Sequence, residues 1–133
     1  MKKIILLMAV ILMGLTATAQ SLEQPEKIKV YCEVMCVQYN LFKQDVNALV
    51  DFGLADKAKY ANGWIYNTEN DKKQSFASPM SVFAYMAKRG WEYMDAIIVT
   101  EGKSNVWHFI LTKTMPANYS DEDIIGDIDY RNK

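Results

Sequence analysis

The chain has 133 residues, 15 Lys and Arg against 16 Asp and Glu, a formal net charge of −1, and hydrophobic residues at half of its positions. This near-neutral balance, without any cluster of basic residues, argues against general binding to nucleic acid or to an anionic membrane surface. The length suits one domain with a modest core.

The first 19 residues have the pattern of a cleaved secretory signal. Lys2 and Lys3 form a basic start, an apolar run extends from Ile4 to Leu15, and the segment ends in Ala-x-Ala at Ala19. This run is shorter than the roughly 20 residues of a membrane-spanning helix, although an uncleaved anchor is the alternative. Residue 20 is Gln20, not the Cys that lipoprotein processing requires. We expect cleavage between Ala19 and Gln20, export to the periplasm or the extracellular space, and no membrane span afterwards.

The expected mature chain is divided into three parts. Removal of residues 1–19, with their two lysines, leaves 114 residues with 13 basic and 16 acidic groups. Residues 20–27 are polar and hold Pro25, which indicates a flexible lead-in. Residues 28–114 form a single domain, and residues 115–133 form an acidic C-terminal tail.

Residues 28–37 alternate between apolar and mixed positions, which predicts a strand with one apolar face. Cys32 and Cys36 both fall on that face. Export favours a disulfide, but four strand steps place the two α-carbons roughly 13 Å apart, and a disulfide requires less than about 7 Å. We therefore expect two buried thiols, unless a helix or a sharp bend brings the cysteines together.

Residues 45–53 alternate again, and their β-branched content favours a strand over a helix spanning residues 41–54. The two strands would form a hairpin through residues 40–44. Residues 54–77 are an irregular excursion. Within it, residues 64–66 and 75–76 could pair as two short strands around a turn at residues 67–73.

Residues 78–90 give the clearest helix pattern. Ser78 suits the N-cap, Pro79 the first helical position and Gly90 the left-handed stop. Residues 91–100 and 105–114 then read as two strands joined by a short turn that contains Gly102, which is typical of an antiparallel hairpin.

The predicted fold class is α+β, in the order β-β-α-β-β. A single antiparallel sheet of about four strands would carry one helix across one face, with the hairpin-like excursion before the helix. The other sheet face would stay partly apolar. We expect it either to be covered by the excursion and tail or to meet a partner, such as a second copy or an envelope protein. Its residues would be Tyr31, Met35, Val37, His108 and Ile110.

The segment Gly90-Trp91-Glu92-Tyr93 between a helix and a strand, followed by a strand ending at residues 108–113, resembles a family of small bacterial domains of unknown function. Most of Lys29–Lys113 is also similar to small exported proteins of gut Gram-negative bacteria. The matching segments are residues 31–33, 50–53, 86–92 and 99–113. The resemblance implies export and the β-β-α-β-β fold. It implies no activity, so it assigns no functional residue.

No motif of catalysis or metal binding stands out. His108 is the single histidine, and a thiol–imidazole pair would need Cys32 or Cys36 to be exposed beside it. The acidic residues of 121–129 partly match a calcium loop, but the closing Glu is replaced by Asn132. Ser120 and Asp123 instead suit a helix capping box. Of the aromatic residues, Trp64 and Tyr66 are the better candidates for exposed stacking surfaces.

We therefore assign no catalytic, cofactor-binding or metal-binding residues and expect no cofactor. The sequence favours an exported, non-enzymatic module that binds a partner or associates with itself. The alternatives are a small secreted enzyme using the Cys/His pair and an accessory or inhibitory subunit of an envelope assembly.

Overall fold

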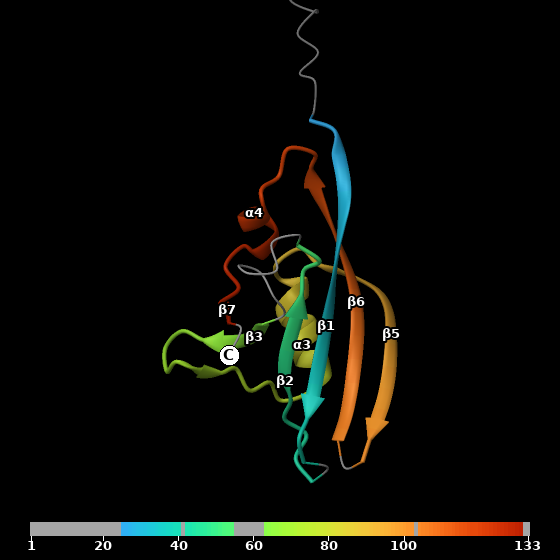
Figure 1. The fold of residues 1–133 in the computed structure, drawn as a ribbon, viewed down its shortest axis with the longest axis vertical. Coiled ribbons are helices and arrows are strands. Elements are labelled where there is room, and N and C mark those ends of the chain that lie inside the picture. The colour runs from blue at the N-terminus through green and yellow to red at the C-terminus, as the bar shows by residue number, and fades with distance from the viewer. Residues whose placement is uncertain (1–24, 41, 55–62, 103, 132–133) are drawn as a thin grey trace, which may run out of the picture.

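The computed structural model describes residues 25–40, 42–54, 63–102 and 104–131 (Figure 1). The expected signal sequence and its cleavage site lie outside the described residues. So does most of the lead-in.

The prediction of about four strands with one helix is wrong. The described residues form seven strands and two short helices. The strands are β1 (Lys27–Gln38), β2 (Asn47–Asp51), β3 (Gly63–Asn67), β4 (Lys72–Lys73), β5 (Glu92–Glu101), β6 (Ser104–Pro116) and β7 (Tyr130–Arg131); the helices are α3 (Pro79–Ala87) and α4 (Asp121–Ile125).

The sheet is antiparallel and has the strand order β4-β3-β2-β1-β6-β5, with β7 paired to β3. The two expected hairpins, β1–β2 and β5–β6, are present. Between them, β1 and β6 pair along their whole length, from Lys27 opposite Pro116 to Gln38 opposite Asn105. The additional strands β4 and β7 have two residues each. Such short strands carry no readable alternation, because only their pairing with β3 defines them.

One face of the sheet forms the core together with α3, which lies behind β1 and β2 in Figure 1. We call this the inner face. Ser78 caps α3 by accepting a hydrogen bond from the Ser81 amide, and Pro79 occupies the first turn, as expected. The helix buries Val82 and Met86. From the sheet, this core includes Val30, Cys32, Val34, Cys36, Val50, Phe109 and Leu111.

The C-terminal residues are also part of the core. Ser120 and Asp123 form the expected capping box at the start of α4. Beyond it the chain buries Ile124 and Ile128 and then adds β7 to β3. A Cβ atom on Gly63 would overlap Cδ2 of the Tyr130 ring, so β7 can approach β3 in this way only because residue 63 has no side chain.

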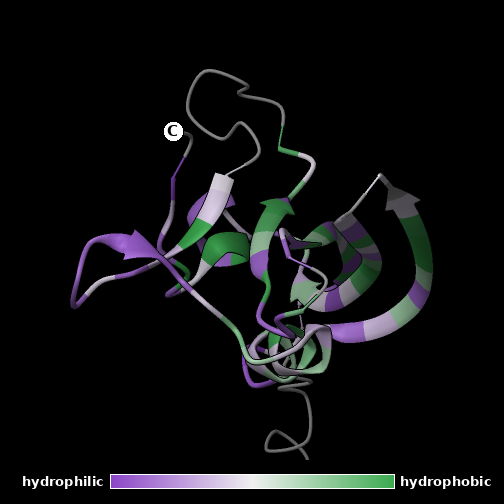
Figure 2. Cartoon of the chain, turned by 90° about the horizontal axis from the view of Figure 1, so that it is seen from below, coloured by the Kyte–Doolittle hydropathy of each residue, from purple (hydrophilic) through white to green (hydrophobic). Residues whose placement is uncertain are grey.

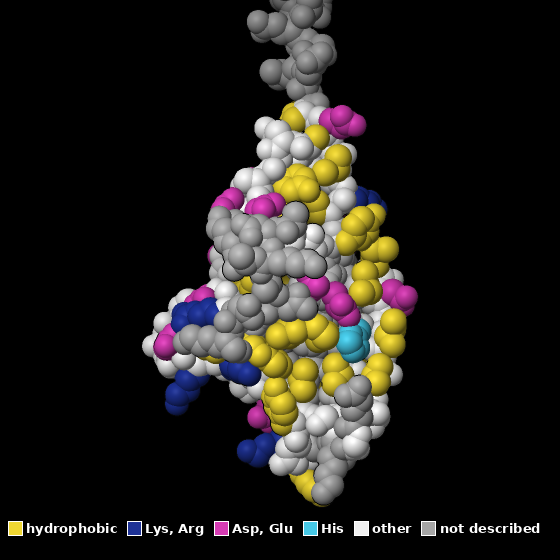
Figure 3. Space-filling model, in the orientation of Figure 1, with side chains coloured by type: hydrophobic (Ala, Val, Ile, Leu, Met, Phe, Trp, Pro, Cys, Tyr) yellow, Lys and Arg dark blue, Asp and Glu magenta, His cyan; other side chains and the backbone are white. Residues whose placement is uncertain are grey.

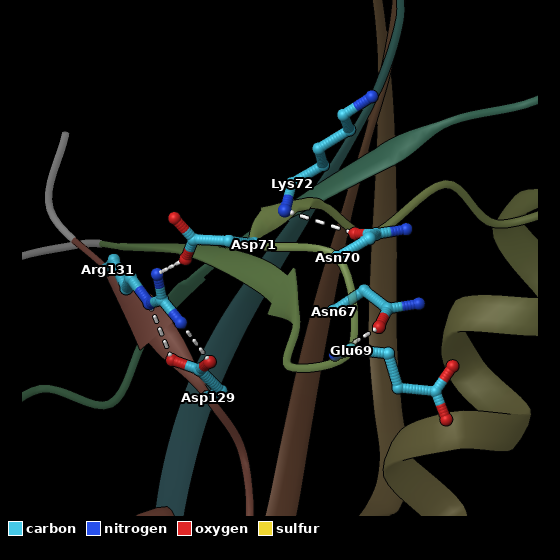
Figure 4. Close-up of polar contacts among 7 residues, drawn as sticks. All are labelled: Asn67, Glu69, Asn70, Asp71, Lys72, Asp129 and Arg131. Atoms are coloured by element: carbon cyan, nitrogen blue, oxygen red, sulfur yellow. Dashed lines mark hydrogen bonds and ion pairs between the residues drawn. The ribbon is translucent and has the colours of Figure 1, made fainter.

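Arg131 connects the C-terminal strand to the β3–β4 turn (Figure 4). Its guanidinium lies between the carboxylates of Asp129 and Asp71, and the distance from Nη2 to Oδ2 of Asp129 is 2.6 Å. The hydrogen bonds to Asp129 and Asp71 raise the pKa of Arg131. At the tip of the same turn, the side chains of Asn67 and Asn70 accept hydrogen bonds from the amides of Glu69 and Lys72. The turn and the C-terminal strand are therefore held together by polar contacts.

Candidate functional site

The two cysteines lie on the inner face as free, buried thiols. Burial raises the pKa of each thiol to about 12, and the charge of Asp51 adds to the effect at Cys32. A thiol with such a raised pKa carries almost no thiolate at neutral pH, and the thiolate is the reactive form.

His108 lies on the opposite face of the sheet. In the β1–β6 register it is opposite Met35, whereas Cys36 is opposite Trp107 and Cys32 is opposite Leu111. Because side chains alternate between the two faces of a strand, the sheet separates the imidazole from both thiols. Nδ1 of His108 is instead 2.6 Å from Oε1 of Glu33. The geometry therefore does not assemble the Cys/His pair.

Both thiols are expected to resist a thiol reagent in the folded protein at pH 8 and to react fully when the protein is unfolded. The free energy of unfolding should fall as the pH rises above the ordinary thiol pKa toward 12, because the unfolded chain ionises these thiols and the folded chain does not. Titration with and without denaturant measures the first effect. Rapid native labelling of Cys32 or Cys36 would contradict the buried placement.

The acidic residues of the tail do not converge on a cation. Asp127 accepts a hydrogen bond from Nε of Arg89 at 2.7 Å, Asp129 is bound by Arg131, and Asp123 belongs to the cap of α4. Among the described residues no group of three or more Asp, Glu, His or Cys side chains could hold a metal ion. These carboxylates therefore serve local structure.

The candidate stacking aromatics face cations of the same chain. Nζ of Lys73 lies 3.8 Å from the centroid of the Trp64 ring, and the guanidinium of Arg131 lies 4.7 Å from that of Tyr66. Trp107 is partly buried against the core. On the ring face that each cation occupies, a sugar ring would have to displace the cation before it could stack.

The remaining candidate is the face of the sheet opposite α3, which we call the outer face. Figure 3 shows it toward the viewer, with hydrophobic side chains on both sides of the histidine and acidic groups beside it. The strand registers place alternating residues of four strands on this face. They are Tyr31, Glu33, Met35 and Val37 of β1, Leu49 and Asp51 of β2, Val106, His108 and Ile110 of β6, and Ile97 and Val99 of β5.

The outer face is ordered in rows across the strands. The row through His108 also holds Leu49, Met35 and Ile97, and Val37, Val106 and Val99 lie in an adjacent row. Ile97 and Val99, which end these rows on β5, are exposed, and so is Tyr31 outside the two rows. The other residues of the two rows are half-buried.

The row on the other side of His108 carries acidic side chains. Glu33 and Asp51 are direct cross-strand partners, and Asp95 is the partner of Ile110 on the far side of β6. A shallow hollow of about 240 Å³ lies here, with Tyr31, Glu33, Asp51 and Ile110 among its lining residues. Like charges on opposed strand positions repel each other. The outer face therefore combines an apolar surface with an acidic border.

The sequence predicted the β1 and β6 part of this face and missed the parts contributed by β2 and β5. In Glu92–Glu101 the run Ala96–Val99 is continuously apolar, a pattern typical of a strand buried on both faces. The pattern does not indicate an edge strand, and only the pairing order places β5 at the edge of the sheet.

Neither family models, nor curated proteins, nor solved structures match this chain. The resemblance to small exported bacterial proteins therefore stays a prediction. In the described part of the chain no helix combines the length and the apolar character needed to cross a membrane.

Proposed function

We propose that the protein is an exported, non-enzymatic module that binds a protein partner through the outer face. The observation that carries this proposal is the apolar surface of four adjacent strands, which has exposed Tyr31 and Ile97 on either side of the Glu33–His108 pair. Large exposed apolar patches with a polar border mark interaction sites. Export rests on the form of residues 1–19, and an accessory subunit of an envelope assembly is one form of this function.

The Glu33–His108 pair supports recognition of a protein rather than simple adhesion. Its two side chains are 37% and 25% exposed, so a partner covering the apolar rows would also cover this hydrogen-bonded pair. A buried polar group without a partner is costly, and here the bond between Nδ1 of His108 and Oε1 of Glu33 pairs one atom of each group. A surface of this kind favours a partner that is apolar over the rows and polar over the pair, and rejects one that leaves a buried charge unpaired.

The proposal is tested by site-specific photo-crosslinking in the producing cells. A photoreactive phenylalanine analogue at Tyr31 should crosslink one partner, whereas the same analogue at Met80 should not. Met80 is a matched control because it is also exposed but lies on α3, on the other side of the sheet. Tyr31→Ser with Met35→Ser should weaken binding of the partner at least about tenfold without loss of the folded circular dichroism spectrum. Equal labelling at both positions, or no adduct at either, would reject the proposal.

A further inference from the structure

We infer that one partner of this protein is a second copy of itself, paired antiparallel along β5 so that the two sheets become continuous. The inference rests on the proposed function, because it names an occupant for the β5 side of the same surface. It is carried by the position of β5 in the sheet, the direction of its free amides and the self-complementarity of its residues.

The strand β5 is a long edge strand with apolar side chains on both faces. It pairs with β6 on one side and ends the strand order of the sheet on the other. The side chains of Ile97 and Ile98 point to opposite faces and are 57% and 64% exposed. Figure 2 shows continuous green along part of this outermost strand. An edge of this kind is a template for strand pairing.

The free edge offers hydrogen-bonding groups at alternate residues. Glu101 is opposite Ser104, and only two residues connect them. In a two-residue hairpin the closing pair, here Glu101 and Ser104, forms two backbone hydrogen bonds with each other. Because hydrogen-bonded pairs alternate along the strand, Val99 and Ile97 also bond β6. The amides of Ala96, Ile98 and Thr100 therefore point away from β6. The observed hydrogen bond of the Ala96 amide is consistent with this: the amide donates to Oδ1 of Asp95 at 2.8 Å.

Little in the sequence of β5 protects this edge. Sheet edges are commonly blocked by Lys, Pro or a bulge. Residues 92–101 contain neither Lys nor Pro, and the register irregularity lies at Tyr93/Asp95, before the apolar stretch. From Ala96 onward the strand is regular, and among the described residues no strand pairs with its outer edge.

A second copy fits this edge best in the register centred on Ile97. In this register Ile97 lies opposite Ile97 of the second copy, and Ala96 of each copy lies opposite Ile98 of the other. No two acidic residues lie opposite each other. A register centred on Ile98 would oppose Asp95 with Glu101 twice, which repels. A register centred on Val99 would overlap only residues 97–101 of the two strands, because β5 ends at Glu101. The preferred register forms on the order of four backbone hydrogen bonds from the two Ala96–Ile98 pairs.

Pairing in this register would make the two outer faces continuous. The apolar rows through His108 and Val106 end at Ile97 and Val99 on β5. The two-fold axis would join the His108 row to its counterpart through the two Ile97 side chains, and Val99 of each copy would lie opposite Asp95 of the other. The Asp95 carboxylate would release the Ala96 amide to the backbone of the second copy.

Cysteine crosslinking tests both the association and the register, with protein expressed from the full-length sequence. Ile97→Cys should give a disulfide-linked dimer on mild oxidation, because directly opposed residues that do not bond each other have α-carbons about 4.5 Å apart, within disulfide range. Ile98→Cys and Val99→Cys should stay uncrosslinked in the same treatment. Cys32 and Cys36 are buried and should not interfere. Crosslinking through Val99 or Ile98 in place of Ile97 would overturn the proposed pairing.

Sedimentation of the unmodified protein provides the second measurement. A species of twice the monomer mass is expected, and Ile98→Pro should weaken dimerisation on the order of tenfold or more, because it removes one outward amide per copy. Proline is tolerated where the missing amide faces solvent, and Ile98→Val is the matched control. A monomer at all concentrations would overturn the inference. Loss of dimerisation with retained crosslinking at Tyr31 to another protein would leave the proposed function intact.

Discussion

A chain that ends at Pro116 is expected to be largely unfolded at room temperature. The truncation removes Ile124 and Ile128, which are 3% and 4% exposed, and also Tyr130, whose ring lies 5.3 Å from that of Phe52. Burial of one such side chain stabilises a fold by about 1.5–3 kcal/mol. The loss of these two side chains together with the partly buried Tyr130 approaches the 5–15 kcal/mol that stabilises a whole domain. Circular dichroism and urea denaturation measure the effect.

Two variants show whether the C-terminal contacts are responsible. A chain that ends at Arg131 keeps all of these contacts and should unfold at the same urea concentration as the full chain. Gly63→Ala should cost about 1–3 kcal/mol, because the new Cβ would meet Tyr130 and would lie 3.0 Å from the backbone of Arg131. If the chain ending at Pro116 unfolded with the same midpoint and slope as the full chain, the tail would contribute nothing to the core.

Trp91→Ala is expected to lower the free energy of unfolding by about 3–5 kcal/mol, because it opens a large cavity in the core. Trp91 is 2% exposed, and its ring centroid lies 5.9 Å from that of Phe52. Chemical denaturation followed by circular dichroism measures the loss without relying on the fluorescence of Trp91.

Trp91→Phe is the informative companion variant. The indole Nε1 has no hydrogen-bond partner among the described residues. Its removal therefore costs no hydrogen bond, and the buried N–H itself is unfavourable. We expect a loss of about 1–2 kcal/mol from the smaller ring alone. A loss as large as that of Trp91→Ala would show that the indole N–H, rather than the volume of the ring, is what the site requires.

In the candidate site, the sequence pattern predicted some of the residues, and the pairing of the strands decided the others. The alternation in residues 28–37 was sufficient to place Tyr31, Met35 and Val37 opposite the cysteines, because the strand period of two is a local property. The same period in residues 105–114 placed His108 and Ile110 with them. The contribution of Ile97 and Val99 could not be predicted, because it depends on which strand lies at the edge.

By itself, the sequence determined the local elements whose signals are carried by neighbouring residues. The capped start of the helix at Pro79, the left-handed Gly90 shortly after its end at Ala87, the two long hairpins and the capping box at Ser120 all follow from side chains within a few positions of each other. Only the tertiary structure decided the number of strands, the closure of the core by residues 124–131 and the edge position of β5. These features depend on pairing between segments far apart in the chain, and a two-residue strand such as β7 exists only through the partner that it meets.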